Sequence, residues 1–184
     1  MNKLSDNEIM LEVKAGEIAK LGLLYERYKN RLFGFFYHMN GNKVQSEDMV
    51  QNVFIRILSY RHTYSSQNNF ASWIFQIARN LNYDSHKRQK KERRKADTLE
   101  QIEDFPQADN IHTKIILGED LSTLRLALDQ IGIENKAFLV LSKLKGLRYK
   151  EIAEIMDCTE GNARTKVHRA LHKLRDTFHQ LEKR

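Results

Sequence analysis

The apolar residues of this 184-residue chain recur at helical spacing, and no Val/Ile-rich stretch alternates in the manner of a β-strand. In the first clear segment, Leu24, Tyr28, Leu32, Phe35 and Met39 step by four, four, three and four residues. Such steps place all five side chains on one face of a helix. The pattern predicts an all-α fold built from amphipathic helices.

Two further helices are predicted before the middle of the chain. The first helix should end near Gly41, because glycine readily adopts the left-handed conformation that closes a helix. Ser46 is a candidate cap for the second helix, and Asn69 precedes the third. Three apolar stripes of this kind can close a single core, which predicts an N-terminal helical domain. The second stripe is Met49, Val50, Val53, Phe54, Ile57 and Leu58, and the third is Phe70, Trp73, Ile74, Ile77, Ala78 and Leu81.

An abrupt change of charge marks the end of this domain. Residues 87–95, KRQKKERRK, hold seven basic residues and one acidic residue, whereas residues 96–110 hold five acidic residues and no basic one. Helical periodicity is lost in the same stretch, beside Pro106, the only proline. We therefore predict two domains joined by a flexible linker. The predicted division is an N-terminal domain at 1–92, a linker at 93–118 and a C-terminal domain at 119–184.

The C-terminal domain ends in a short amphipathic helix, a tight break and a basic helix. Its first two helices are marked by Leu121, Leu124, Leu128 and Ile131 and by Phe138, Leu141 and Leu144, the second ending at Gly146. In YKEIAEIMDCTEGNARTKVHRALHKL, residues 157–159 form the break and Thr159 is a good N-cap for the helix that follows. The apolar positions of that helix leave Asn162, Arg164, Thr165, Lys166, His168, Arg169 and Lys173 facing outward.

A cationic outer face behind a short turn is what a recognition helix needs in order to lie in the major groove. The alternative is an ordinary helical hairpin with a solvated basic face. The net charge of +7 and the sequence pI near 9.4 favour a polyanionic partner, although such a charge also serves solubility. Apolar runs are too short for a membrane span, no secretion signal is recognisable, and Cys158 is the only cysteine. We expect a cytoplasmic protein.

A polar loop that runs into an aromatic helix forms a second candidate site, at residues 61–80, RHTYSSQNNFASWIFQIARN. Unpaired bases stack on aromatic rings with a gain of about 1–3 kcal/mol per base, and amide side chains can read their exposed edges. The spacing of Phe70 and Trp73 is also explained by burial in the core, whereas Tyr64 is less easily explained in that way. The candidate base-binding residues are Tyr64, Asn68, Asn69, Gln76 and Asn80.

Four segments together resemble the extracytoplasmic-function (ECF) group of bacterial RNA polymerase sigma factors, in the sigma-70 family. They are LLYERYKNRLFGFFYHM, SEDMVQNVFIRIL, FASWIFQIARNLNYD and GLRYKEIAEIMDCTEGNARTKVHRALHKLR, and the resemblance covers about residues 18–90 and 120–178. It implies that the first domain is region 2, which docks on the polymerase clamp and captures the melted minus-10 element. The second domain would be region 4, which binds the minus-35 element and the polymerase flap.

The resemblance also assigns roles to single residues. Asp48, Gln51 and Phe54 match an Asp-x-x-Gln-x-x-Phe helix whose polar side contacts the clamp, and Asn52 stands where an acid is common. Polymerase binding is thus predicted for Asp48, Gln51 and Asn52, with Phe54 in the core. The segment from Tyr64 to Asn80 matches the strand-capturing element. The residues matched to minus-35 recognition are Tyr149, Lys150, Arg164, Thr165, Lys166, His168 and Arg169.

The resulting hypothesis is an initiation factor that recognises promoter DNA and promotes its melting by holding bases that have left the stack. The acidic part of the linker would lie in a basic channel of the polymerase, in the family's manner. An anti-sigma partner is common in the family, and nothing in the sequence identifies one.

No catalytic group, cofactor or metal is expected. His168 and His172 have a zinc-binding spacing, but Arg169 stands where a zinc protease needs glutamate, which argues against a zinc site. Two other functions stay open. The main alternative is an operator-binding helix-turn-helix regulator that acts without polymerase. A nuclease that uses scattered carboxylates is the other alternative.

Overall fold

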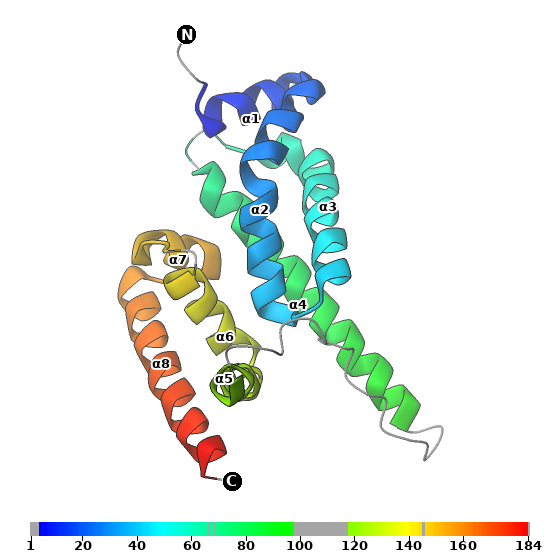
Figure 1. Ribbon diagram of the computed structural model, residues 1–184. Coiled ribbons are helices and arrows are strands. Elements are labelled where there is room, and N and C mark those ends of the chain that lie inside the picture. Colours follow the sequence, from blue (N-terminus) through cyan, green and yellow to red (C-terminus); the bar gives the residue numbers. More distant parts are fainter. Residues whose placement is uncertain (1–3, 66, 68, 98–117, 145, 184) are drawn as a thin grey trace.

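The computed structural model describes residues 4–65, 67, 69–97, 118–144 and 146–183 (Figure 1). Within these ranges the chain forms eight α-helices with short helical connections and contains no strand. The predicted all-α class is therefore confirmed. No helix in the described ranges combines the length and the apolar character that a bilayer crossing requires.

The N-terminal domain is built on three helices that bury the predicted stripes. Helices α2 (Leu21–Asn40), α3 (Lys43–Tyr60) and α4 (Phe70–Asp97) pack on one another, and α1 (Asp6–Ala15) crosses their end (Figure 1). The stripe predicted on α2 is buried throughout. The side chains without any exposed surface in this core include Leu24, Leu32, Phe35, Val53, Ile57, Phe70, Ile74 and Ala78.

The turn between α2 and α3 confirms one predicted cap and corrects another. Gly41 ends α2 in the left-handed conformation, with φ of 72°. Helix α3 begins at Lys43, earlier than predicted, because the Asn42 side chain accepts a hydrogen bond from the Gln45 backbone N–H at 2.9 Å. Ser46 is buried in the first turn, and its hydroxyl lies 2.6 Å from the Asn42 carbonyl oxygen, to which it donates. The prediction that Ser46 caps the helix is wrong.

Helix α1 was missed by the periodicity argument, although the sequence carries its end signals. Ser5 and Glu8 form a capping box, in which the Ser5 backbone N–H donates to the Glu8 carboxylate at 2.7 Å. Gly16 closes the helix with φ of 119°. Ile9, Met10 and Val13 are fully buried, so the helix covers one end of the core.

The C-terminal domain contains α5 (Gly118–Gln130), α6 (Ile133–Leu139) with a π-helical turn at Val140–Leu144, α7 (Tyr149–Met156) and α8 (Glu160–Glu182). Helix α8 packs on the other three. The predicted break is confirmed: Asp157 takes a left-handed conformation with φ of 54°, and the Thr159 hydroxyl accepts from the Asn162 backbone N–H at 3.2 Å. These residues turn the chain sharply between α7 and the basic helix.

Helix α4 extends beyond the predicted end of the N-terminal domain. It continues to Asp97, past the predicted boundary at 92, and so includes the whole basic run 87–95. The remainder of the predicted linker, up to 117, lies outside the described residues.

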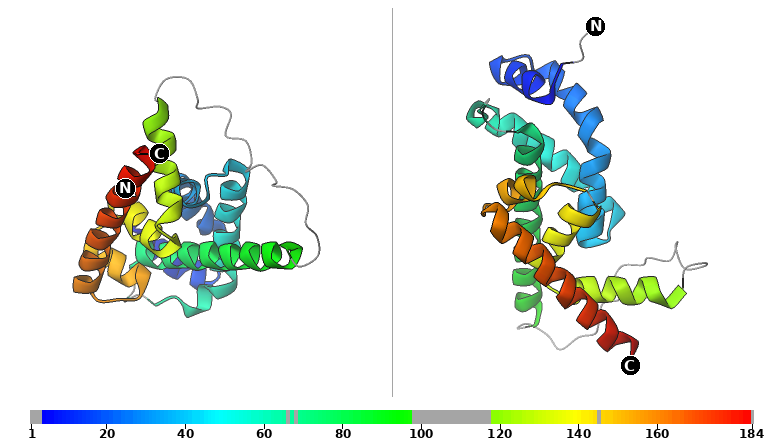
Figure 2. Two further views of the ribbon diagram at one scale, coloured as in Figure 1. Left: turned by 90° about the horizontal axis from the view of Figure 1, so that it is seen from below. Right: turned by 90° about the vertical axis from the view of Figure 1, so that its left-hand side faces the viewer.

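The two domains pack against each other, an arrangement that the sequence did not predict. Helix α7 lies beside the first half of α4 (Figures 1 and 2). One apolar cluster contains residues of both domains, from Phe70 and Ile74 to Phe138 and Ile152. On another side of the contact, the Arg125 guanidinium of α5 donates to the Gly41 carbonyl oxygen at 3.1 Å. A Cβ at position 41 would lie 1.7 Å from the end of the Arg125 side chain, so the guanidinium would have to move to accommodate one.

The corrected cap gives a direct test. Replacing Asn42 with alanine should lower the free energy of unfolding by about 1 kcal/mol, because a backbone N–H at the start of α3 loses its acceptor. Urea unfolding followed by circular dichroism measures the change. Lys43→Ala is the matched control, since Lys43 is exposed in the same turn, and it should leave the midpoint almost unchanged. Equal stability of Asn42→Ala and the native chain would contradict the assignment.

Candidate nucleic-acid interface

Tyr64, predicted to stack on a base, lies inside the protein. It has no exposed surface, and its ring centroid lies 5.0 Å from that of Trp73. Its hydroxyl donates to the Asn7 side-chain oxygen at 3.0 Å, and its carbonyl accepts from the Lys14 ammonium at 2.6 Å. Burial, assisted by the nearby Asp6 carboxylate, raises the pKa of Tyr64 to about 12. Tyr64 therefore anchors the loop before α4, and its ring is closed to a base in this structure.

Asn7 of α1 joins the two ends of that loop. Its side-chain oxygen accepts both the Tyr64 hydroxyl and the Phe70 backbone N–H, the latter at 2.9 Å. Asn69 caps the same end of α4, because its side-chain oxygen accepts from the Ala71 backbone N–H at 2.9 Å. Asn7 of α1 thus ties the first residue of α4 to Tyr64 at the other end of the loop.

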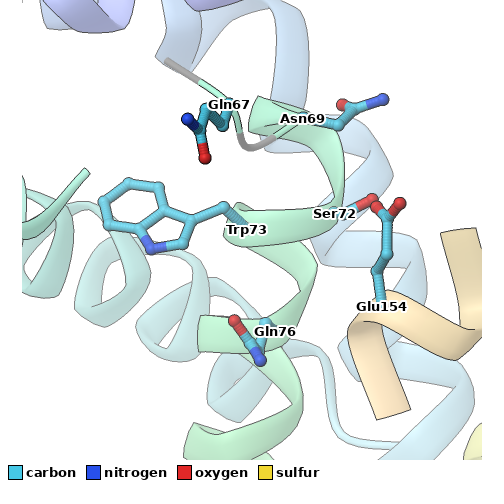
Figure 3. A pocket seen from close by; sticks show the side chains of 6 residues that line it. All are labelled: Gln67, Asn69, Ser72, Trp73, Gln76 and Glu154. Atoms are coloured by element: carbon cyan, nitrogen blue, oxygen red, sulfur yellow. The ribbon is translucent and has the colours of Figure 1, made fainter. Parts of the chain in front are cut away.

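A cavity of about 310 Å³ opens beside these first turns (Figure 3). The half-buried Trp73 packs its indole on Tyr64 on one side and lines the cavity on another. The cavity lining therefore combines an indole with side-chain amides, which offers both a stacking surface and hydrogen-bonding groups. The lining residues are Gln67, Asn69, Ser72, Trp73 and Gln76 from the loop and α4, and Glu154 from α7.

The cavity separates the predicted base-binding residues into groups. Asn69 and Gln76 line it, as their spacing on one helix face allowed. Asn80 is exposed farther along α4 and accepts from the Arg79 guanidinium at 2.7 Å, while Asn68 lies outside the described residues. Gln67 was missed among the candidates, and Trp73 had been explained by burial, although both lie in the stretch that the sequence singled out. Trp73 in fact serves both the core and the cavity.

The basic face of α8 is exposed as predicted. Arg164, Thr165, His168 and Arg169 are all open to solvent, while Ala163, Val167 and Ala170 are buried beneath them. On α7, Lys150 is exposed, and the half-buried Tyr149 ring lies 5.4 Å below the Arg164 guanidinium. This contact holds Arg164 above the turn between the two helices.

Lys166 differs from its neighbours on α8. Its ammonium lies 2.5 Å from the Glu134 carboxylate of α6 and above the Phe138 ring at 5.4 Å. An ammonium paired this closely attracts a phosphate less strongly than the exposed guanidinium of Arg164, whose acidic neighbour Glu160 lies farther away, at 3.9 Å. The seven predicted duplex contacts are therefore not equivalent.

A third exposed surface runs along α3. Asp48, Gln51 and Asn52 are open to solvent, and the same side carries Val44 and Ile55, which are 68% and 58% exposed. Apolar side chains left open beside polar ones are typical of a surface that contacts another protein. Phe54 points the other way, into the core, where its ring lies 5.0 Å from that of Tyr25.

Comparison with known proteins identifies the family. Residues 24–92 match the family model for sigma-70 region 2, and residues 121–174 match that for sigma-70 region 4. The chain belongs to the ECF group of the sigma-70 family. It is 29% identical to the ECF RNA polymerase sigma factor SigX of Bacillus subtilis over 159 residues, covering 83% of this chain and 80% of that protein.

Other sigma factors support the same assignment. The chain is 30% identical to the ECF RNA polymerase sigma factor BldN of Streptomyces coelicolor over 177 residues, which covers 92% of this chain and 66% of BldN. Among solved structures, the fold resembles that of CnrH in complex with the cytosolic domain of CnrY, with a TM-score of 0.70, 17% identity and coverage of 93% and 95%. It also resembles the sigma factor RpoE in complex with the anti-sigma factor NepR from Bartonella quintana, with a TM-score of 0.65, 20% identity and coverage of 85% and 95%. These structures agree with the α-helical two-domain fold.

The role of Asn7 in this sigma factor can be measured. Asn7→Ala removes the acceptor of the hydrogen bonds from the Tyr64 hydroxyl and the Phe70 backbone N–H, so we expect a loss of about 2 kcal/mol in the free energy of unfolding. Urea unfolding and the emission maximum of Trp73, the only tryptophan, report on it. Asn30→Ala, on an exposed position of α2, is the control. If both variants unfold at the same midpoint, Asn7 does not hold the loop.

Proposed function

We propose that this sigma factor binds core RNA polymerase, recognises the minus-35 and minus-10 elements of promoters and promotes DNA melting at the start of transcription. The observation that carries the proposal is the presence, in one chain, of an open basic recognition helix and a cavity that combines an indole with amides. A duplex and a separated strand are different ligands, and a promoter being opened presents both.

In region 4, α8 would enter the major groove of the minus-35 element. Arg164 and Arg169 project from its exposed face and can donate to base edges and phosphates, while Lys150 at the start of α7 can reach the backbone. Thr165 and His168 lie between the two arginines on the same open side. Lys166 would contribute mainly after it leaves Glu134.

In region 2, the cavity beside α4 would hold a base that has left the duplex. Unstacking a base costs a few kcal/mol, and stacking it on an aromatic side chain returns about 1–3 kcal/mol. Trp73 would provide the stacking surface, with Asn69, Gln76 and Gln67 at the base edges. Capture of this kind shifts the promoter toward the open state and requires no bond chemistry, so we propose no catalytic role for any residue.

The α3 surface would dock on the polymerase clamp through Asp48, Gln51 and Asn52, with Val44 and Ile55 adding apolar contact at its edge. Region 4 would contact the flap. Two of the similar folds were solved with CnrY and with the anti-sigma factor NepR, and we extend the anti-sigma class of partner to this chain. The linker would pass through a channel of the polymerase.

Reconstituted transcription tests the proposal against the operator-binding alternative. Core polymerase, the chain and fragmented genomic DNA should yield defined transcripts that neither protein produces alone. An operator-binding regulator would instead bind a duplex tightly by itself and leave core polymerase without promoter-specific starts. The match to region 2, which such a regulator does not need, argues against that alternative.

The clamp assignment predicts a specific loss of binding. Asp48→Ala combined with Gln51→Ala should weaken binding to core polymerase in a pull-down by at least about tenfold, because two exposed polar groups at an interface lose their partners. The fold should be unaffected, since both residues are exposed. The control pair, Gln89→Ala with Glu92→Ala on exposed positions of α4, removes an amide and an acid elsewhere. Equal retention of both pairs would rule out the α3 surface.

The duplex assignment predicts a template-dependent defect. Arg164→Ala should cost about 1–3 kcal/mol in the use of the upstream element if the guanidinium contacts a base. Transcripts from a mapped promoter should fall accordingly, and the defect should disappear on a template whose upstream element has been replaced. Arg175→Ala, farther along α8 and also exposed, is the matched control. A defect that persists on the replaced template would contradict groove reading by Arg164.

A further inference from the structure

Two exposed histidines of α8 lie against each other, one helical turn apart. The Nε2 atoms of His168 and His172 are 3.3 Å apart, and the ring centroids are 4.4 Å apart. Side chains four residues apart share one face of a helix, so both rings can turn toward a common point in the solvent. Two imidazole nitrogens therefore converge on the surface of the basic helix.

The separation of the two nitrogens suits a tetrahedral metal ion. Nitrogen ligands lie about 2.0–2.1 Å from zinc, so two of them on a tetrahedral ion are about 3.3 Å apart. The observed Nε2–Nε2 distance is the same. Imidazole is also a preferred ligand of zinc, copper and nickel. An ion can thus replace the proton between the two rings without any change in the backbone of α8.

Arg169 excludes protease chemistry at this pair but not metal binding. In zinc proteases that carry two histidines at this spacing, the glutamate after the first one is a general base and is not a ligand. Within the described ranges, no group of three or more His, Cys, Asp or Glu side chains is arranged to hold a metal ion. Water would therefore complete the coordination, and the site would bind more weakly than a structural zinc site with four protein ligands.

Arg175 is the one contact that metal binding has to displace among those that the structure gives for the two rings. Its guanidinium lies 3.3 Å from Nδ1 of His172. A neutral ring that binds an ion through Nε2 carries its proton on Nδ1, so Arg175 has to turn away. Arg175 is exposed, and the Asp176 carboxylate, 3.7 Å from its Nε, offers another partner.

We propose that His168 and His172 form a two-imidazole binding site for a divalent transition-metal ion, Zn²⁺ by the distance between the nitrogens, on the exposed face of α8. The site itself does not depend on the proposed function of that helix. One consequence does: a ring nitrogen that binds a metal ion cannot also contact a base edge. Bound metal and a minus-35 contact by Nε2 of His168 therefore exclude each other.

Titration calorimetry with zinc chloride tests the site in the full chain, prepared without an affinity tag. The native chain should bind the ion, and His168→Gln and His172→Gln should each bind it at least about tenfold more weakly, because even the loss of a partner outside the ligand shell costs about 10–100-fold. Both residues are exposed, so the fold should be kept, which circular dichroism checks. The matched control is His179→Gln, which removes another exposed histidine of α8, one that contacts Glu182 at 3.0 Å. It should keep the native affinity.

Urea unfolding with and without zinc gives a second readout. An ion that binds the folded helix raises the midpoint, so zinc should stabilise the native chain and His179→Gln more than His168→Gln or His172→Gln. Native affinity in both of these variants, or no zinc binding by the native chain, would overturn the site. The proposed function is judged separately, by transcription with core polymerase in the absence of added zinc.

Discussion

Helix α4 is the element on which the rest of this sigma factor depends, because both domains pack against it. Its first turns insert Phe70, Ile74 and Ala78 among α2 and α3, and α7 of region 4 packs beside the same part of the helix. A helix with apolar contacts on more than one side needs more than one partner. Trp73 lies where these contacts meet, so the stacking surface proposed for a base is also part of the core.

Ion pairing distinguishes the basic residues that can meet phosphate from those that serve the fold. Lys136 is 7% exposed and has its ammonium 2.5 Å from the Asp129 carboxylate, as a buried cation requires. Lys166 lies 2.5 Å from the Glu134 carboxylate, whereas the exposed Arg164 has its acidic neighbour Glu160 only at 3.9 Å, and Arg169 is exposed on the same helix. The net charge of +7 is therefore a poor guide to the strength of DNA binding, which depends on the basic side chains that lack a close acidic neighbour.

Predictions from the sequence succeeded where the signal lay within a few residues. Gly41 and Thr159 act at helix ends as expected, because a cap is decided by a left-handed residue or by a side chain that reaches a backbone group of its own helix. The prediction that Ser46 caps α3 is wrong because Asn42, four residues earlier, accepts the hydrogen bond from a backbone N–H in the first turn. The burial of Tyr64 was not predicted, because Asn7, which accepts its hydroxyl hydrogen bond, lies 57 positions away on a helix that periodicity did not reveal.

The sequence alone determined the all-α class, the order of the main helices, the outward basic face of α8 and the membership of the sigma-70 family. Each of these follows from apolar spacing, from local caps or from motifs in a fixed order. Only the tertiary structure decided that Tyr64 is internal, that Lys166 is paired and that Glu154 of α7 reaches the Trp73 cavity. These are contacts between residues remote in the chain, and no local periodicity or cap encodes which side chain a distant helix will bring beside another.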